Sequence, residues 1–212
     1  MKSSLIRPAL ALALVAGLAG CGGSDKAEFT VKGTIAGIVY PGGVLSTNGM
    51  DLPINPPAKA GDPVTFEFPN KLEYGDVYNV QFTKFPANQA RCGTPTNVIP
   101  NFTDTAGRLA EINITLQCAV DEYTVGGTVT GLTGSGLTVA NGSTGNNGEI
   151  ALPTTPTTTP LTYSLPVPVP FGTSYSVAII TQPAGQVCTL VNGTGVMAAA
   201  NVSNVNITCV AR

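Results

Sequence analysis

One stretch of sequence occurs twice in this chain. Residues 29–37 read Phe-Thr-Val-Lys-Gly-Thr-Ile-Ala-Gly, and 94 positions later residues 123–131 read Tyr-Thr-Val-Gly-Gly-Thr-Val-Thr-Gly. Further landmarks follow in the same order in both copies, and each copy carries two cysteines near its end. A repeat of about 90 residues has the size of a small domain. The sequence therefore predicts two similar domains in tandem rather than one large core.

The pattern within each copy predicts β-strands. Apolar or small residues alternate with polar ones, as at Val31, Gly33 and Ile35, and clusters of Gly, Pro and Asn separate the alternating segments. The 25 glycines and 17 prolines among the 212 residues favour turns and strand edges over long helices. About seven short strands per copy fit an all-β fold of two tandem antiparallel β-sandwich domains of the immunoglobulin-like kind. An up-and-down barrel is the alternative, but it does not need two self-similar halves of domain size.

The first twenty residues have the pattern of a signal peptide. Lys2 and Arg7 give a short positive segment, residues 8–17 are apolar, and small residues follow. The apolar run is shorter than the roughly 18 to 20 residues that a permanent membrane-spanning helix needs. We therefore expect a removed signal peptide, a lipidated N-terminus with a short tether, a first sandwich repeat and a second sandwich repeat, at residues 1–20, 21–28, 29–120 and 121–212.

The end of this segment, Leu18-Ala19-Gly20-Cys21, resembles the lipobox of bacterial lipoproteins. The resemblance implies that the Cys21 thiol receives a diacylglycerol, that the preceding peptide is cleaved, and that the new N-terminus is acylated. Several acyl chains, with each buried CH2 contributing about 0.8 kcal/mol, would anchor the chain to a membrane without a transmembrane helix. Gly22 replaces the Asp that retains many Gram-negative lipoproteins at the inner membrane, so the outer membrane is the expected location in the bacterial cell envelope. The periplasmic and the surface-exposed face are both left open.

The five cysteines divide without a remainder if Cys21 is lipidated. The other four form one pair per repeat at equivalent places, Cys92 with Cys118 and Cys188 with Cys209, which predicts two disulfides in an oxidising compartment. A zinc site would need closely spaced Cys-x-x-Cys pairs or histidine partners, and the sequence has neither. We therefore predict no metal site.

The side chains that usually carry catalysis are missing or isolated. The chain has no histidine, and lipidation and pairing use every cysteine, so the common general bases and nucleophile pairs cannot be assembled. From residue 123 onward the only charged side chains are Glu149 and Arg212, which excludes a two-carboxylate glycosidase site in the second repeat. We therefore predict that the protein is not an enzyme and needs no cofactor.

The first repeat contains the residue types of one covalent arrangement. Some surface sandwiches join a first-strand Lys to a last-strand Asn beside a carboxylate, and this repeat offers Lys32, Asn113 and Glu67. Each of the three lies between residues that the alternation assigns to the core, so their side chains are predicted to point outward. A bond of this kind requires the core, and we do not expect it here.

Aromatic residues are the natural contacts for a sugar, because sugar rings stack on flat apolar faces. Tyr40, Phe85 and Phe102 have no aromatic equivalent in the second copy, and we predict them as the better candidates for an exposed contact, with ordinary core filling as the alternative. Aromatic residues that recur in register are expected in the core or at tyrosine corners; they are Phe29, Phe66, Tyr74 and Tyr78 in the first copy and Tyr123, Tyr163, Phe171 and Tyr175 in the second.

Charge narrows the range of partners. Ten basic and twelve acidic residues give a formal net charge of −2, with no basic run outside the N-terminus, so no nucleic-acid partner is expected.

We predict a non-enzymatic, lipid-anchored cell-envelope protein that serves as a surface or periplasmic binding, adhesion or spacer module. Its partners would be the membrane, through the lipid anchor, and a glycan or an envelope protein. The alternative is an accessory subunit that docks onto a partner envelope enzyme or secretion complex.

The repeats resemble the tandem immunoglobulin-like or transthyretin-like sandwich modules of bacterial surface and periplasmic lipoproteins. Residues 123–132, 181–188 and 204–209 carry the resemblance. It implies the sandwich fold and an exported protein, but it brings no catalytic residue, because such sandwiches are scaffolds whose function lies in their loops. The ligand therefore stays open.

Overall fold

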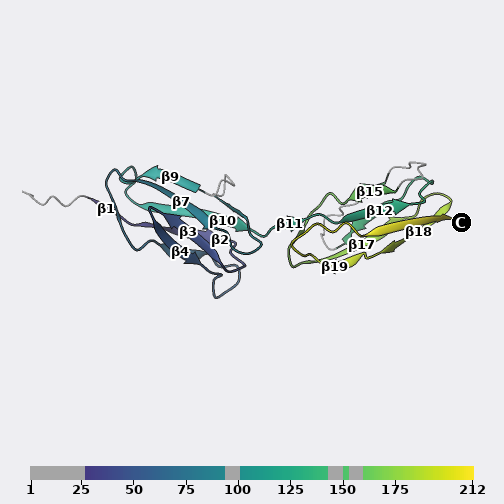
Figure 1. Cartoon of the computed structure of the whole chain (residues 1–212), viewed down its shortest axis with the longest axis horizontal. Coiled ribbons are helices and arrows are strands. Elements are labelled where there is room, and N and C mark those ends of the chain that lie inside the picture. Colours follow the sequence, from purple (N-terminus) through teal and green to yellow (C-terminus); the bar gives the residue numbers. More distant parts are fainter. Residues whose placement is uncertain (1–26, 94–100, 143–149, 153–159) are drawn as a thin grey trace, which may run out of the picture.

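The computed structural model describes residues 27–93, 101–142, 150–152 and 160–212. The regular elements in these parts of the chain are all β-strands, and no helix there is long and apolar enough to span a membrane. The strands form two sandwiches that lie end to end along the long axis of the molecule, with the C-terminus at the outer end of the second (Figure 1). The predicted all-β fold of two tandem sandwiches is confirmed.

The first sandwich has two four-stranded sheets and one short two-stranded pair. The sheets have the strand orders β5-β2-β10-β8 and β4-β3-β7-β9, and β1 pairs with β6. The strands are β1 (Glu28–Phe29), β2 (Val31–Ala36), β3 (Gly43–Thr47), β4 (Met50–Ile54), β5 (Val64–Glu67), β6 (Leu72–Glu73), β7 (Val77–Lys84), β8 (Arg91–Gly93), β9 (Asn101–Thr105) and β10 (Ile112–Ala119).

The second sandwich repeats this arrangement strand for strand. Its sheets have the orders β15-β12-β20-β18 and β14-β13-β17-β19, and β11 pairs with β16. The strands are β11 (Glu122–Tyr123), β12 (Gly126–Thr130), β13 (Thr138–Asn141), β14 (Ile150–Ala151), β15 (Leu161–Ser164), β16 (Val169–Pro170), β17 (Ser174–Thr181), β18 (Gln186–Val191), β19 (Thr194–Val196) and β20 (Asn206–Ala211).

Each sandwich departs from a purely antiparallel pattern at one place. The first long strand runs parallel to the last one, β2 beside β10 and β12 beside β20. The register is the same in both copies, since Ile35 lies opposite Leu116 in the first and Val129 opposite Ile207 in the second. The expectation of antiparallel sheets is therefore wrong for this one pair. It failed because alternation reveals a strand but not the direction of its neighbour.

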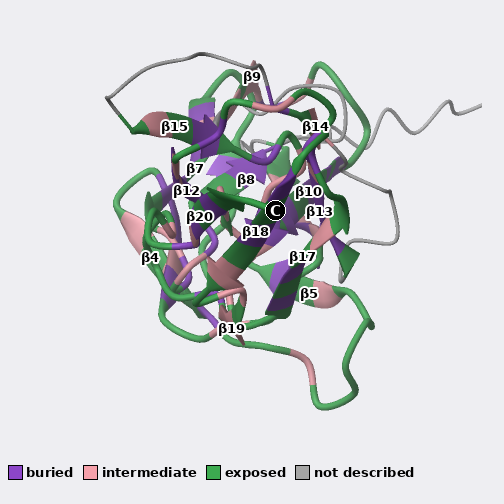
Figure 2. Cartoon of the chain, turned by 90° about the vertical axis from the view of Figure 1, so that its right-hand side faces the viewer, coloured by how far each residue is buried: buried purple, intermediate pink, exposed green. Residues whose placement is uncertain are grey.

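The buried side chains form two separate cores. Alternation along β10 is complete, with Ile112, Ile114, Leu116 and Cys118 buried and the residues between them exposed. One cluster of buried and packed residues lies within residues 29–118 and the other within residues 123–209. Viewed along the long axis from the C-terminal side, buried segments lie toward the middle of the strands and exposed loops form the rim (Figure 2). Each sandwich therefore has its own hydrophobic core.

Candidate functional site, the joint between the two sandwiches

Both predicted disulfides are present in the structure. Cys92 is bonded to Cys118 and Cys188 to Cys209, and in each pair the two residues lie directly opposite each other on neighbouring strands, with Cα atoms 4.0 Å apart. The bonds thus join the edge strand of a sheet to the strand beside it, rather than one sheet to the other. They fasten β8 and β18, which are the end strands of their sheets in the part of the chain that the structure describes.

A buried glutamine stands just before the first cysteine of each pair. Gln89 has no exposed surface and Gln186 is only 5% exposed. The Gln89 side-chain oxygen accepts hydrogen bonds of 2.8 Å from the backbone N–H groups of Val39 and Tyr40, and its amide group donates to the Gly37 carbonyl at 2.7 Å. One carboxamide therefore satisfies three backbone groups of the loop that follows β2.

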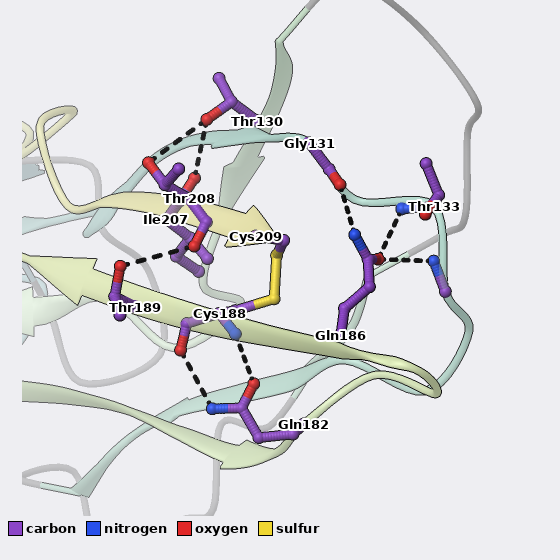
Figure 3. Close-up of a disulfide and its surroundings, with 11 residues drawn as sticks. Thr130, Gly131, Thr133, Gln182, Gln186, Cys188, Thr189, Ile207, Thr208 and Cys209 are labelled. Atoms are coloured by element: carbon purple, nitrogen blue, oxygen red, sulfur yellow. Dashed lines mark hydrogen bonds between the residues drawn. A yellow bond between two sulfur atoms is a disulfide. The ribbon is translucent and has the colours of Figure 1, made fainter. Parts of the chain in front are cut away.

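Gln186 makes the same three bonds to the loop after β12. Its oxygen accepts from the N–H groups of Thr133 and Gly134, and its amide group donates to the Gly131 carbonyl (Figure 3). The sequence analysis did not identify Gln89 and Gln186, whose buried side chains are hereafter called the glutamine clamps. A signal was available, because Pro86-Ala87-Asn88-Gln89 and Pro183-Ala184-Gly185-Gln186 occupy equivalent places just before the first cysteine of each pair.

The clamp in the first sandwich leads directly to the joint, because it fixes Tyr40. The Tyr40 ring meets the ring of Phe171, in the second sandwich, edge to face, with centroids 5.6 Å apart and an interplanar angle of 73°. Gly172 lies under the Tyr40 hydroxyl, since a Cβ built there would be 3.1 Å from that oxygen. The two aromatic residues thus close one side of the contact between the sandwiches.

Asp121 ties the connecting chain to both sandwiches. Only two residues separate β10 from β11. The Asp121 N–H donates to the Asn88 carbonyl at 2.8 Å, and its side chain accepts from the Ala90 N–H at 2.9 Å, both in the first sandwich. Its carbonyl accepts from the Phe171 N–H of the second sandwich at 2.8 Å. One residue therefore holds both partners of the joint through its backbone and side chain.

Arg91 adds a third fastening on the same connection. Its guanidinium donates to the Val120 carbonyl at 2.8 Å and lies 3.3 Å from the Glu122 carboxylate. Both side chains are partly exposed, so the ion pair itself contributes about 0 to 1 kcal/mol. The bond to the Val120 carbonyl fixes the backbone of the connection. Together with Asp121 and the aromatic pair, it restricts rotation of one sandwich against the other.

The aromatic residues predicted as exposed contacts are packed. Tyr40 is half-buried in the joint, Phe85 stacks on Phe82 with centroids 5.7 Å apart, and Phe102 stacks on Tyr78 at 6.2 Å. Packing, the alternative to an exposed contact, is therefore observed for all three, and turn neighbours in the sequence do not show which way a loop folds back. The exposed ring is instead Tyr74, with 69% of its surface accessible, although its recurrence in register predicted a place in the core.

Lys32, Glu67 and Asn113 lie side by side on the outer face of the first sandwich. Lys32 is opposite Glu67 on β5 and opposite Asn113 on β10. Lys32 is partly exposed and the other two are exposed, as the alternation predicted. The Lys32 ammonium group lies 3.6 Å from the carboxylate of Glu111. This exposed face lacks the apolar surroundings that a lysine–asparagine bond requires.

One buried tyrosine of the second core has a structural role. Tyr163 is 9% exposed, its hydroxyl donates to the Val205 carbonyl at 2.8 Å, and burial raises its pKa to about 12. In the described parts of the chain, no three His, Cys, Asp or Glu side chains gather closely enough to hold a metal ion. Cys21 and the rest of residues 1–26 lie outside the described residues, so lipidation stays a prediction.

No family model matches the chain, and no curated protein matches it in sequence. Two solved structures are similar in part. One is the Bacillus anthracis TIE protein, at 14% identity and a TM-score of 0.45, where the match covers 86% of this chain and 34% of that one, so this chain spans about a third of that length. The other is the shaft pilin SpaA from Lactobacillus rhamnosus GG, at 10% identity and a TM-score of 0.30, covering 88% and 98%. At these values neither likeness carries an argument about function.

Proposed function

We propose that this protein is a lipid-anchored, non-enzymatic spacer of the bacterial cell envelope that holds its second sandwich away from the membrane. The observation that carries the proposal is the joint. Asp121 bonds to both sandwiches, and Tyr40 packs against Phe171 across the boundary. A flexible linker would decouple the two domains, whereas a connection of two residues with such contacts keeps them end to end. The lipobox resemblance supplies the anchor at Cys21.

The second sandwich is the contact domain in this proposal. Within its described residues Arg212 is the only charged side chain from residue 123 onward. Thr130, Thr208 and Thr189 lie opposite one another across β12, β20 and β18 and form an uncharged row on the outer face (Figure 3). A neutral surface of hydroxyl groups lacks electrostatic steering and suits carbohydrate or protein edges better than nucleic acid or acidic lipid.

The two disulfides support an oxidising compartment, as expected for an exported protein.

The experiment that tests the anchored placement is protease digestion of intact cells beside permeabilised cells, with Cys21→Ala as the matched variant. Loss of the second sandwich on intact cells places it outside. Protection until permeabilisation places it in the periplasm. Release of the wild-type protein in soluble form contradicts the anchor.

Stiffness is tested separately by small-angle X-ray scattering on residues 22–212 produced alone, a parent chain without the signal peptide and without Cys21. We expect one narrow distribution of distances for this parent chain and a broader one for the chain that also carries Tyr40→Ala and Asp121→Ala. Asp62→Ala, in an exposed loop of the first sandwich, is the control and leaves the distribution unchanged. A parent distribution as broad as that of the joint variant removes the spacer role.

A second candidate function is that of an accessory subunit docked on a partner envelope protein. It is favoured by exposed aliphatic side chains on the second sandwich: Ile180, Val187, Val191 and Val210 are 55%, 38%, 55% and 60% exposed. Val187 and Val210 are cross-strand partners on β18 and β20. Co-purification of one envelope protein with the wild type but not with Val187→Ser/Val210→Ser, together with no affinity for glycans, favours this function over the first.

A further inference from the structure

Each sandwich presents an aromatic residue at its N-terminal end, in the loop after the short strand pair. Tyr74 in the first sandwich corresponds to Phe171 in the second. The backbone is the same around both, because the Tyr74 N–H donates to the Ala27 carbonyl at 2.9 Å and the Phe171 N–H donates to the Asp121 carbonyl at 2.8 Å. The two rings therefore leave their sandwiches from equivalent positions.

The two rings differ in what covers them. Phe171 packs on Tyr40 of the sandwich that precedes it. Tyr74 is 69% exposed, and within the described residues only Ala27 precedes β1. The ring of Tyr74 lies against Gly107, where a Cβ would overlap it, so the neighbouring turn supports its inner face. The first sandwich thus presents an uncovered copy of the ring that the second sandwich uses for docking.

Two more apolar side chains are exposed at the same end of the first sandwich. Val77 is 64% exposed at the start of β7, and Leu109 is 57% exposed in the turn before β10. The loops that carry them are joined by backbone hydrogen bonds, from Gly75 N–H to the Ala106 carbonyl at 3.0 Å and from Ala106 N–H to the Asp76 carbonyl at 2.8 Å. Tyr74, Val77 and Leu109 are hereafter the apolar tip.

The basic side chains near the apolar tip are already paired with acids. Lys71 lies 3.2 Å from Glu28, and Arg108 donates to Asp104 at 2.9 Å. Among the described residues, both basic side chains at this end are therefore engaged with acids, and the tip suits a surface that accepts apolar side chains without a charge requirement. Tyrosine suits an interface between water and an apolar phase, because its ring is apolar and its hydroxyl stays in contact with water.

The length of chain between the tip and the lipid decides what covers the tip. Cys21 and Ala27 are six residues apart in sequence. Fully extended, six residues reach at most about 20 Å, so the N-terminal end of the first sandwich cannot leave the vicinity of the membrane surface. We propose that Tyr74, Val77 and Leu109 rest in the headgroup region of the membrane to which Cys21 anchors the chain. This inference rests on the proposed function, because it requires the anchor.

The consequence is a defined orientation. A lipid anchor alone leaves the first sandwich free to tilt within the reach of its tether. A second contact through the apolar tip makes the N-terminal end the foot of the molecule and directs the second sandwich away from the membrane.

Tryptophan fluorescence tests this contact directly, since the chain contains no tryptophan. Tyr74→Trp places one fluorophore at the tip, and Ile180→Trp places one at the exposed end of β17, on the far side of the second sandwich. Both acylated proteins are reconstituted into phosphatidylcholine vesicles, with and without brominated acyl chains. The tip fluorophore is expected to shift to the blue and to lose emission in brominated vesicles, and the Ile180→Trp fluorophore to show neither change.

The outcomes separate the two proposals. Mass spectrometry of each purified protein first establishes whether Cys21 is acylated. If Cys21 carries no lipid, the proposed anchor fails and the membrane contact fails with it. If Cys21 is acylated but the emission of Tyr74→Trp matches that of its Cys21→Ala counterpart, with the same quenching by iodide, only the tip contact is overturned. Equal quenching in both tryptophan variants also overturns it, because the molecule then lies flat.

Discussion

Gln186 does in the second sandwich what Gln89 does in the first: each buried carboxamide holds the loop after the first long strand through two accepted hydrogen bonds and one donated bond. The loop in the first sandwich carries Tyr40 and so builds the joint. The loop in the second sandwich has Gly134 at that position and presents no ring. The same clamp therefore holds a loop that contacts the next sandwich in one copy and a loop without an aromatic ring in the other.

Gln186→Ala removes all three bonds from a site that is closed to water. Unpaired buried backbone groups are costly, and we expect the second sandwich to lose about 3 kcal/mol of unfolding free energy. The matched control is Gln182→Ala, because the Gln182 side chain also bonds to backbone groups but is exposed. It accepts from the Cys188 N–H at 2.7 Å and donates to the Cys188 carbonyl at 3.0 Å. Its removal is expected to cost about 1 kcal/mol or less. Urea unfolding measures both, and equal losses contradict the role of burial.

Gly131→Ala tests a close approach of backbone to backbone. Gly131 has a φ of +73°, and a Cβ there would overlap the Cys209 carbonyl oxygen. Both the positive φ and the overlap destabilise the variant, and we expect its free energy of unfolding to fall by more than about 2 kcal/mol. Gly136→Ala is the control, since Gly136 has a φ of +90° but open space around it, and it should lose about 1 kcal/mol. Thermal unfolding compares the two, and similar shifts leave strain in φ as the only effect.

Each disulfide is expected to stabilise its own sandwich alone, because the two cores share no buried residue. Cys188→Ala/Cys209→Ala opens a loop with a sequence separation of 21 and should lower the stability of the second sandwich by about 3 kcal/mol. The first sandwich should keep its transition. Hydrogen exchange read by mass spectrometry assigns the unfolding to each half. A parallel loss in both halves would show that the sandwiches unfold as one unit.

Alkaline pH should weaken the second sandwich through Tyr163. Burial raises its pKa from 10.0 to about 12, so the folded state keeps a proton that the unfolded state has already lost. The stabilisation is complete below about pH 10 and is lost as the pH rises toward about 12, by about 1 to 2 kcal/mol. The midpoint of urea unfolding followed across this range measures the loss. Tyr163→Phe is expected to be less stable at neutral pH, without its bond to the Val205 carbonyl, and to show a flatter profile.

Much of the fold could be predicted from the sequence because it is written in local patterns. The repeat identified two sandwiches, alternation placed Lys32 on the outer face, and the position of Cys92 and Cys118 at equivalent sites gave their pairing. The joint could not be predicted in the same way. The contacts of Tyr40 and Asp121 depend on how one sandwich is placed against the other, and no pattern within a single repeat contains that information.

The glutamine clamps could be predicted from the sequence only in part. Gln89 and Gln186 stand in matching short motifs, so comparison of the repeats could have found them. Hydrophobic patterning overlooks them, because it assigns a polar glutamine to the surface. A polar residue is buried without loss only where backbone groups are arranged to satisfy it, and that arrangement exists only once the loop has folded.

Parallel pairing of the first and last long strands determines how each sandwich responds to a pulling force. The chain enters β2 at one end of the sandwich and leaves β10 at the other, and β12 and β20 repeat this in the second. Tension applied between the N-terminus and the second sandwich is therefore expected to slide β2 along β10, so that the hydrogen bonds between them share the strain instead of opening one after another. The disulfides on β10 and β20 fasten the loaded strand to a further neighbour. If the N-terminus is anchored as proposed, we expect this arrangement to resist pulling on the second sandwich.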